Sequence, residues 1–85
     1  GGVHTNSGIP NRAFYLAASA LGGHAWERAG QIWFDTVTTK GVPKDIDFAG
    51  FAARTVKAAS KRYGTTSEEG TAVEEAWATV GVVLP

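Results

Sequence analysis

The chain has 85 residues, eight basic and eight acidic side chains, a formal net charge of zero, and neither cysteine nor methionine. Balanced charge argues against nucleic acid as a partner, because domains that bind polyanions usually carry a clustered basic excess. The lack of cysteine excludes disulfides, thiolate metal sites and a cysteine nucleophile. No apolar run reaches the roughly 18–20 residues of a membrane span, so we expect no membrane partner.

The length predicts one small domain. A hydrophobic content of 44%, with three tryptophans, suffices for a packed core, and the moderate charge argues against disorder. The start at Gly1-Gly2 shows no charged segment leading into an apolar stretch, so we expect no signal peptide here. Removal of an initiator methionine and processing from a longer chain are both compatible with this start.

Apolar spacing predicts four helices and no strand. The first is expected over residues 7–21, with Ser7 as N-cap, Pro10 tolerated in the first turn, and Gly22-Gly23 ending the helix. Its predicted apolar residues are Ile9, Ala13, Leu16, Ala17 and Ala20.

The second helix is expected over residues 25–37. Its predicted buried face consists of Trp26, Ala29, Trp33 and Val37, which recur at helical spacing. Gly30 weakens this helix by about 1 kcal/mol relative to alanine, or permits a close helix crossing. Residues 38–47 form a connection that Gly41 and Pro43 interrupt.

The third helix is expected over residues 48–63, with Asp47 as N-cap and Gly64 in the left-handed C-cap position. Its predicted apolar stripe is Phe48, Ala52, Val56, Ala59 and Tyr63, with Phe51 and Thr55 beside it.

The fourth helix begins near Thr66, which with Glu69 matches a capping box, and ends at Gly81. Its predicted buried face is Val73, Ala76, Trp77 and Val80. The short link makes the third and fourth helices antiparallel neighbours. Charges at their facing ends should then attract each other by a few tenths of a kcal/mol: Lys61 and Arg62 on one side, Glu68 and Glu69 on the other. We expect an all-α bundle of four to five short helices around the three tryptophans.

His4 is the candidate catalytic residue. A histidine just before a capped helix can be aimed into a neighbouring cleft, where its imidazole donates a hydrogen bond to a developing oxyanion. The alternative is a surface histidine in a frayed N-terminus.

Other polar and aromatic residues have simpler interpretations. The segment His24–Arg28 narrowly misses the inverted zinc motif His-x-x-Glu-His, because arginine cannot serve as the last ligand at neutral pH. Asn6 and Asn11 could orient a substrate, but a role in the turn and first helical turn is the simpler one. The stripe Arg54, Lys57 and Lys61 is interpreted as a solvated face, and Trp26, Trp33 and Trp77 as core.

One run resembles, almost residue for residue, the segment that opens the last helices of thermolysin-like zinc metalloproteases: Gly1-Gly2-Val3-His4-Thr5-Asn6-Ser7-Gly8-Ile9-Pro10-Asn11. The similarity continues through Gly22-Gly23, the 26–37 helix after a shorter loop, residues 63–69 and Val80-Gly81-Val82. The resemblance covers essentially the whole chain. The His-x-Asn-Ser-Gly-Ile-x-Asn core is specific to the family, whereas the later helices alone are weak evidence.

This resemblance implies that residues 1–85 are a single C-terminal α-helical domain of a zinc metalloendopeptidase. In the family an N-terminal catalytic domain binds zinc through a His-Glu-x-x-His helix and a further glutamate, and the complete enzyme also holds Ca²⁺. The histidine matching His4 donates a hydrogen bond to the tetrahedral intermediate, beside one wall of the cleft that binds the peptide or protein substrate. The resemblance also implies that the parent enzyme is secreted.

Several family parts are missing from this chain. The zinc ligands, the general base, the substrate-gripping arginine and an aspartate that orients the histidine all lie outside it, so we expect no zinc site in the chain and no proteolysis by it alone. Two other interpretations stay open: an autonomous, non-catalytic helical binding module derived from such a protease, and a structural bundle with a chance motif.

Overall fold

The computed structural model describes residues 8–22, 25–39, 41 and 46–84. Within these residues the chain forms four α-helices and no strand. They are α1 (Gly8–Leu21), α2 (Ala25–Thr38), α3 (Phe48–Tyr63) and α4 (Glu68–Thr79). The prediction of an all-α fold is confirmed, and the expected helix ranges agree to within two residues at each described end.

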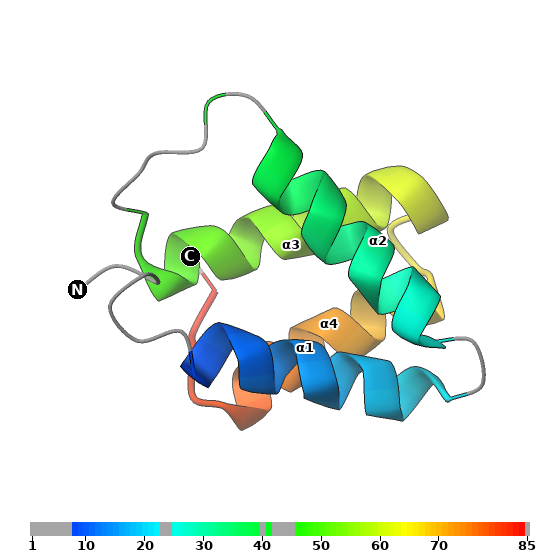
Figure 1. The fold of residues 1–85 in the computed structure, drawn as a ribbon, viewed down its shortest axis with the longest axis horizontal. Coiled ribbons are helices and arrows are strands. Elements are labelled where there is room, and N and C mark those ends of the chain that lie inside the picture. The colour runs from blue at the N-terminus through cyan, green and yellow to red at the C-terminus, as the bar shows by residue number, and fades with distance from the viewer. Residues whose placement is uncertain (1–7, 23–24, 40, 42–45, 85) are drawn as a thin grey trace.

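The helices form two pairs that pack on each other (Figure 1). In that view α1 and α2 lie in front, and α3 and α4 lie behind them. Each helix packs against two others, because α1 contacts α2 and α4, while α3 contacts α2 and α4. The chain runs in opposite directions in α3 and α4, as their short link predicts.

The core lies where the four helices meet, around Trp77. This side chain is fully buried and packs face to face with Trp33, with ring centroids 6.0 Å apart, and edge to face with Phe51 at 6.1 Å. Small residues fill much of the remaining space and let the helices approach closely. The buried cluster comprises Ala13, Ala17, Ile32, Phe51, Ala52, Ala59, Val73, Ala76 and Trp77.

The predicted core is correct for most of α4 and needs correction elsewhere. Val73, Ala76 and Trp77 are buried as expected, whereas Val80 is only partly buried. On α1 the inward residues are Ala13, Ala17 and Ala18, whereas Ala20 is exposed. On α3 the buried residues are Phe51, Ala52, Thr55 and Ala59. The buried face is therefore rotated from the predicted stripe toward Phe51 and Thr55, which were expected to lie beside it.

The face predicted for α2 is largely wrong. Ala29, Ile32 and Thr36 are buried, while Val37 is 60% exposed and Trp26 is 52% exposed. Only Trp77 is a fully buried tryptophan, and Trp33 is half-buried. The reason is that α2 is apolar on more than one side, so helical spacing alone cannot tell which side meets the other helices.

Two N-caps start the last two helices. The Asp47 carboxylate accepts a hydrogen bond from the Gly50 N–H at 2.7 Å, as predicted. The cap of α4 is Ser67, whose hydroxyl oxygen accepts from the Gly70 N–H at 3.1 Å, so the predicted Thr66 cap is wrong by one residue. Gly64, with φ of 105°, takes the positive φ expected at the end of α3.

Ion pairs connect helices in a pattern that the sequence did not predict. Arg28 of α2 contacts both acids at the start of α4, Glu68 at 2.8 Å and Glu69 at 2.7 Å. Arg62 of α3 pairs with Asp35 of α2 at 2.6 Å. The expected pairing between the end of α3 and the start of α4 is therefore replaced by pairing of each with α2.

The described residues contain no helix long and apolar enough to cross a membrane.

Candidate functional site

The predicted catalytic residue precedes α1, so α1 is the described helix that lies next to it in the sequence. His4 and Asn6 lie outside the described residues, as does His24. The helix that was expected to carry His4 is present and begins at Gly8. Asn11 lies in its first turn and is exposed, which agrees with its simpler interpretation.

Packing on two sides holds α1 firmly in the bundle. Its buried residues Ala13 and Ala17 belong to the central core, which fixes the helix against α4. On the other side, Phe14 packs edge to face against Trp33, with centroids 5.4 Å apart, and lies 5.5 Å from Trp26. The helix that follows the predicted catalytic residue is therefore held in the bundle by contacts on two sides.

The region of the near-miss zinc motif offers no metal site among the described residues. Glu27 is exposed in the first turn of α2, and Arg28 points to α4, where it binds Glu68 and Glu69. No three His, Cys, Asp or Glu side chains lie close enough to hold a metal ion anywhere in the part of the chain that the structure describes.

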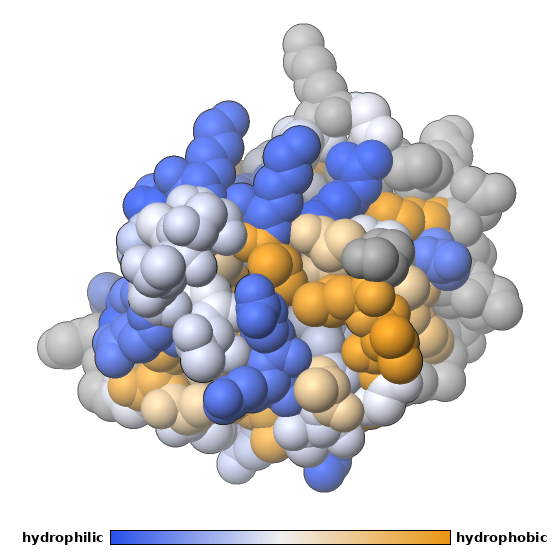
Figure 2. All heavy atoms as spheres, turned by 180° about the vertical axis from the view of Figure 1, so that it is seen from behind, coloured by the Kyte–Doolittle hydropathy of each residue, from blue (hydrophilic) through white to orange (hydrophobic). Residues whose placement is uncertain are grey.

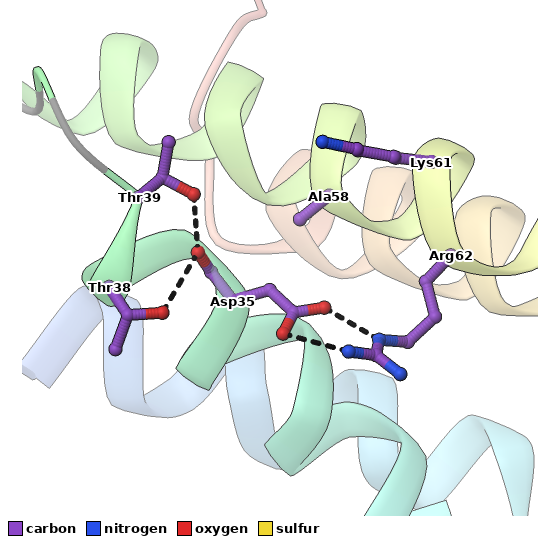
Figure 3. A pocket seen from close by; sticks show the side chains of 6 residues that line it. All are labelled: Asp35, Thr38, Thr39, Ala58, Lys61 and Arg62. Atoms are coloured by element: carbon purple, nitrogen blue, oxygen red, sulfur yellow. Dashed lines mark hydrogen bonds and ion pairs between the residues drawn. The ribbon is translucent and has the colours of Figure 1, made fainter.

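The basic stripe of α3 borders a hollow that the sequence did not reveal. Lys57 and Lys61 are exposed, in agreement with a solvated face, whereas Arg54 is half-buried and donates to the Gly41 carbonyl. An open hollow of about 520 Å³ lies between α3 and the end of α2, lined by Asp35, Thr38, Thr39, Ala58, Lys61 and Arg62 (Figure 3). The sequence does not indicate this hollow, because the residues that line it come from two helices that are separated along the chain.

Asp35 and Arg62, which line this hollow, are paired with each other. Arg62 donates to both carboxylate oxygens of Asp35, at 2.6 and 3.1 Å, and Gln31 donates to one of them at 2.9 Å. The hydrogen bonds from Arg62, and next the one from Gln31, hold the pKa of Asp35 below its ordinary value. Asp35 therefore stays ionised and paired.

The hydroxyl groups in the hollow are committed as well. Thr38 donates to the Phe34 carbonyl at 2.7 Å. Thr39 donates to the Asp35 carbonyl at 2.6 Å, and Thr38 also lies 3.5 Å from that carbonyl oxygen (Figure 3). Neither hydroxyl has a histidine or a free carboxylate beside it as a base among the described residues. The described ion pair and hydrogen bonds at the hollow therefore connect α3 to α2.

Sequence comparison relates the chain to known proteases. The family described as thermolysin metallopeptidase, alpha-helical domain, matches residues 1–82. The chain is 57% identical to an extracellular metalloprotease of Pectobacterium carotovorum subsp. carotovorum and 48% identical to the protease PrtS of a Photorhabdus species. Both matches cover 96% of this chain, but only 23% and 22% of the respective relatives.

A solved structure shows the same fold. The precursor of protealysin, a metalloproteinase from Serratia proteamaculans, superimposes with a TM-score of 0.84 at 60% sequence identity. The match covers 98% of this chain and 25% of that one. The chain thus spans about a quarter of the length of the proteins it resembles.

Proposed function

This chain belongs to the thermolysin metallopeptidase α-helical domain family, and from that premise we propose that residues 1–85 act as a single C-terminal domain of a zinc-dependent metalloendopeptidase. In the complete enzyme the domain forms one wall of the substrate cleft and presents His4 to the peptide bond that is cleaved. The observation that carries the proposal is the family match, which runs from residue 1 to residue 82 and so includes His4.

His4 supplies a hydrogen bond to the oxyanion that develops on the substrate's carbonyl oxygen. An imidazole suits this role because its N–H donates a directional hydrogen bond in a site where water is excluded. The rigid packing of α1 against α2 and α4 supports the proposal, since a preorganised donor needs a fixed base.

The metal belongs to the rest of the polypeptide. The described residues do not form a zinc site, and we propose that zinc, and also Ca²⁺, are held by the N-terminal catalytic domain. There zinc acts as a Lewis acid toward the peptide carbonyl and activates water. The chain alone is accordingly inactive, and its partners are that catalytic domain and the peptide or protein substrate.

We further propose that the parent enzyme is secreted. Support comes from relatives named extracellular metalloprotease and extracellular minor metalloprotease, the latter from Serratia marcescens and 41% identical over 78 residues.

The test is His4→Ala in the complete protease. We expect kcat to fall about 10²–10³-fold, as for loss of an oxyanion donor, with a much smaller change in KM. Steady-state kinetics on a peptide substrate measures both constants, and elemental analysis should show unchanged zinc content, because His4 is not a ligand.

His24→Ala is the matched control, since it removes the chain's other histidine from a segment to which we give no catalytic role. It should leave kcat within about two-fold of the parent value, well under 1 kcal/mol in barrier height. A His4→Ala enzyme whose KM rises while kcat stays unchanged would contradict the role in transition-state stabilisation.

A binding module is the second candidate, and the observation that favours it is a set of exposed apolar side chains: Tyr15, Trp26, Phe34, Val37 and Val83. Such side chains suit docking to another protein surface. Mixing the chain with the separate N-terminal domain distinguishes the candidates. Recovery of zinc-dependent proteolysis supports the half-enzyme, whereas binding without activity favours the module.

A further inference from the structure

Helix α2 is apolar on two adjoining faces, and this chain buries only one of them. The inner face consists of Ala29, Ile32 and Thr36, all of which are buried. The outer face comprises Trp26, Gly30, Phe34 and Val37, of which Trp26, Phe34 and Val37 are more than half exposed. Trp33 lies between the two faces, half-buried and stacked on Trp77.

The width of the apolar surface is the first argument. At about 100° per residue, the two faces together cover roughly 200° of the circumference of α2. A helix on the outside of a small domain needs an apolar sector little wider than about 100°. The additional sector indicates that α2 has packing partners on both sides.

Gly30 is the second argument. It lies inside the outer face, in the middle of a regular helix, where glycine is among the least favourable residues. A Cβ added there would meet nothing within 4 Å among the described residues. The bundle itself therefore gives no reason for a glycine, whereas close approach of another segment does.

The outer face continues onto α1 through aromatic contacts. Tyr15, itself exposed, lies 6.0 Å from Trp26 between ring centroids, and Phe14 contacts both Trp26 and Trp33. Figure 1 shows α1 and α2 together on one side of the molecule, with α3 and α4 behind them. The opposite side, seen in Figure 2, carries charged side chains with apolar patches between them. The aromatic contacts thus join the outer face of α2 to α1.

We propose that this outer face of α2 is covered by an apolar segment of the protease polypeptide outside residues 1–85, which packs closely over Gly30. The inference rests on the proposed function, and the relatives give the reason for this occupant. The chain covers 23% of the Pectobacterium protease and 25% of the protealysin precursor, so most of each polypeptide lies outside the matching part.

Cysteine labelling of the complete protease tests the proposal. Phe34→Cys and Val37→Cys place thiols on the outer face, Lys57→Cys places one on the exposed side of α3, and Ala76→Cys places one in the core. Labelling by a maleimide is followed at each substituted residue by peptide mass spectrometry. We expect both outer-face thiols to react at least ten-fold more slowly than the Lys57→Cys thiol.

The control thiols make every outcome decisive. If Ala76→Cys is protected while Phe34→Cys and Val37→Cys react as fast as Lys57→Cys, the enzyme is folded with the outer face open, and the proposal is wrong. Protection that disappears on dilution identifies a second copy of the enzyme as the cover and also overturns it. The labelling pattern should be the same in the His4→Ala enzyme. The test of the outer face is therefore independent of the test of the catalytic role of His4.

Gly30→Leu gives a second readout, because the change in Tm should have opposite signs for a covered and an open outer face. Under a close-packed cover, leucine overpacks the contact and lowers the Tm of the complete protease by about 2–4 °C or more. With an open face, replacing a helical glycine raises the Tm, which would overturn the proposal. Ala20→Leu, which adds bulk at an exposed position of α1, controls for added apolar surface.

Discussion

At the scale of single residues, Thr55 and Trp77 form the polar centre of an otherwise apolar core. Both are fully buried, and the Trp77 Nε1–H donates to the Thr55 hydroxyl oxygen at 2.7 Å. The same hydroxyl donates to the Ala52 carbonyl at 2.7 Å. No described buried side-chain polar atom lacks a hydrogen-bond partner. Thr55 supplies the partner of the Trp77 indole N–H, which allows the whole indole to be buried.

Removing this hydroxyl should destabilise the bundle. Thr55→Val keeps the shape of the side chain but leaves the buried indole N–H without an acceptor, which costs about 1–3 kcal/mol. Urea unfolding followed by tryptophan fluorescence measures the change. Thr55→Ser retains the acceptor and should lose less; an equal or larger loss for serine would show that the methyl group, and not the hydrogen bond, stabilises the site.

At the scale of elements, short-range chemistry sets where α3 and α4 begin. Asp47 and Ser67 each bind a backbone N–H three residues later, which satisfies one of the free donors of the first turn. At α3 the partner is a glycine for a steric reason as well. A Cβ on Gly50 would lie 2.9 Å from the Asp47 carboxylate oxygen and 3.0 Å from Ile46.

The two candidates for the α4 cap can be separated by substitution. Ser67→Ala removes the observed acceptor and should lower the free energy of unfolding by about 1 kcal/mol. Thr66→Ala should have a small effect, because Thr66 is exposed and Ser67 holds the cap position. Chemical denaturation of both variants measures the difference, and a larger loss for Thr66→Ala would restore the capping box that the sequence predicts.

At the scale of the whole molecule, ion pairs connect α2 to both α3 and α4. Arg28 binds the start of α4, and Asp35 binds Arg62 of α3. The hydrogen bond from Arg28 holds the pKa of Glu69 below its ordinary value of 4.5, and that from Arg62 holds the pKa of Asp35 below 3.8. Both carboxylates therefore favour the folded state when they are ionised.

The pH dependence of stability follows from these directions. Since both pKa values are lower in the folded state, the contribution is complete above the ordinary values and disappears as the pH falls below them through the folded values. Arg28→Gln should therefore shift acid unfolding to higher pH, as followed by circular dichroism.

Arg54→Gln is the control for this shift, because Arg54 donates to a backbone carbonyl, that of Gly41, and should leave the acid profile nearly unchanged. The shift should also shrink in 1 M salt, where the screening length is about 3 Å. An identical acid profile for Arg28→Gln and the parent would show that the Arg28 pairs contribute nothing to folding.

The sequence predicts much of the local structure, because the signals act over a few residues. The spacing of apolar side chains, the glycines after α1 and α3, and the Asp47 cap all involve neighbours within about one helical turn. The family motif around His4 is likewise local, and it led to the family that the comparison confirms. The role of His4 stays a prediction until the substituted enzyme is measured.

The inward face of α2 and the partners of its charges could not be predicted in this way. Arg28 pairs with Glu69, 41 residues away, and the choice of Ile32 over Val37 for the core depends on how α2 lies against helices that follow it. Such contacts depend on the packing of the complete bundle, and several pairings of similar charges are equally compatible with the residue order. Residue order was enough for the helices and the family, whereas packing of the four helices determined which apolar face of α2 is buried and which is exposed.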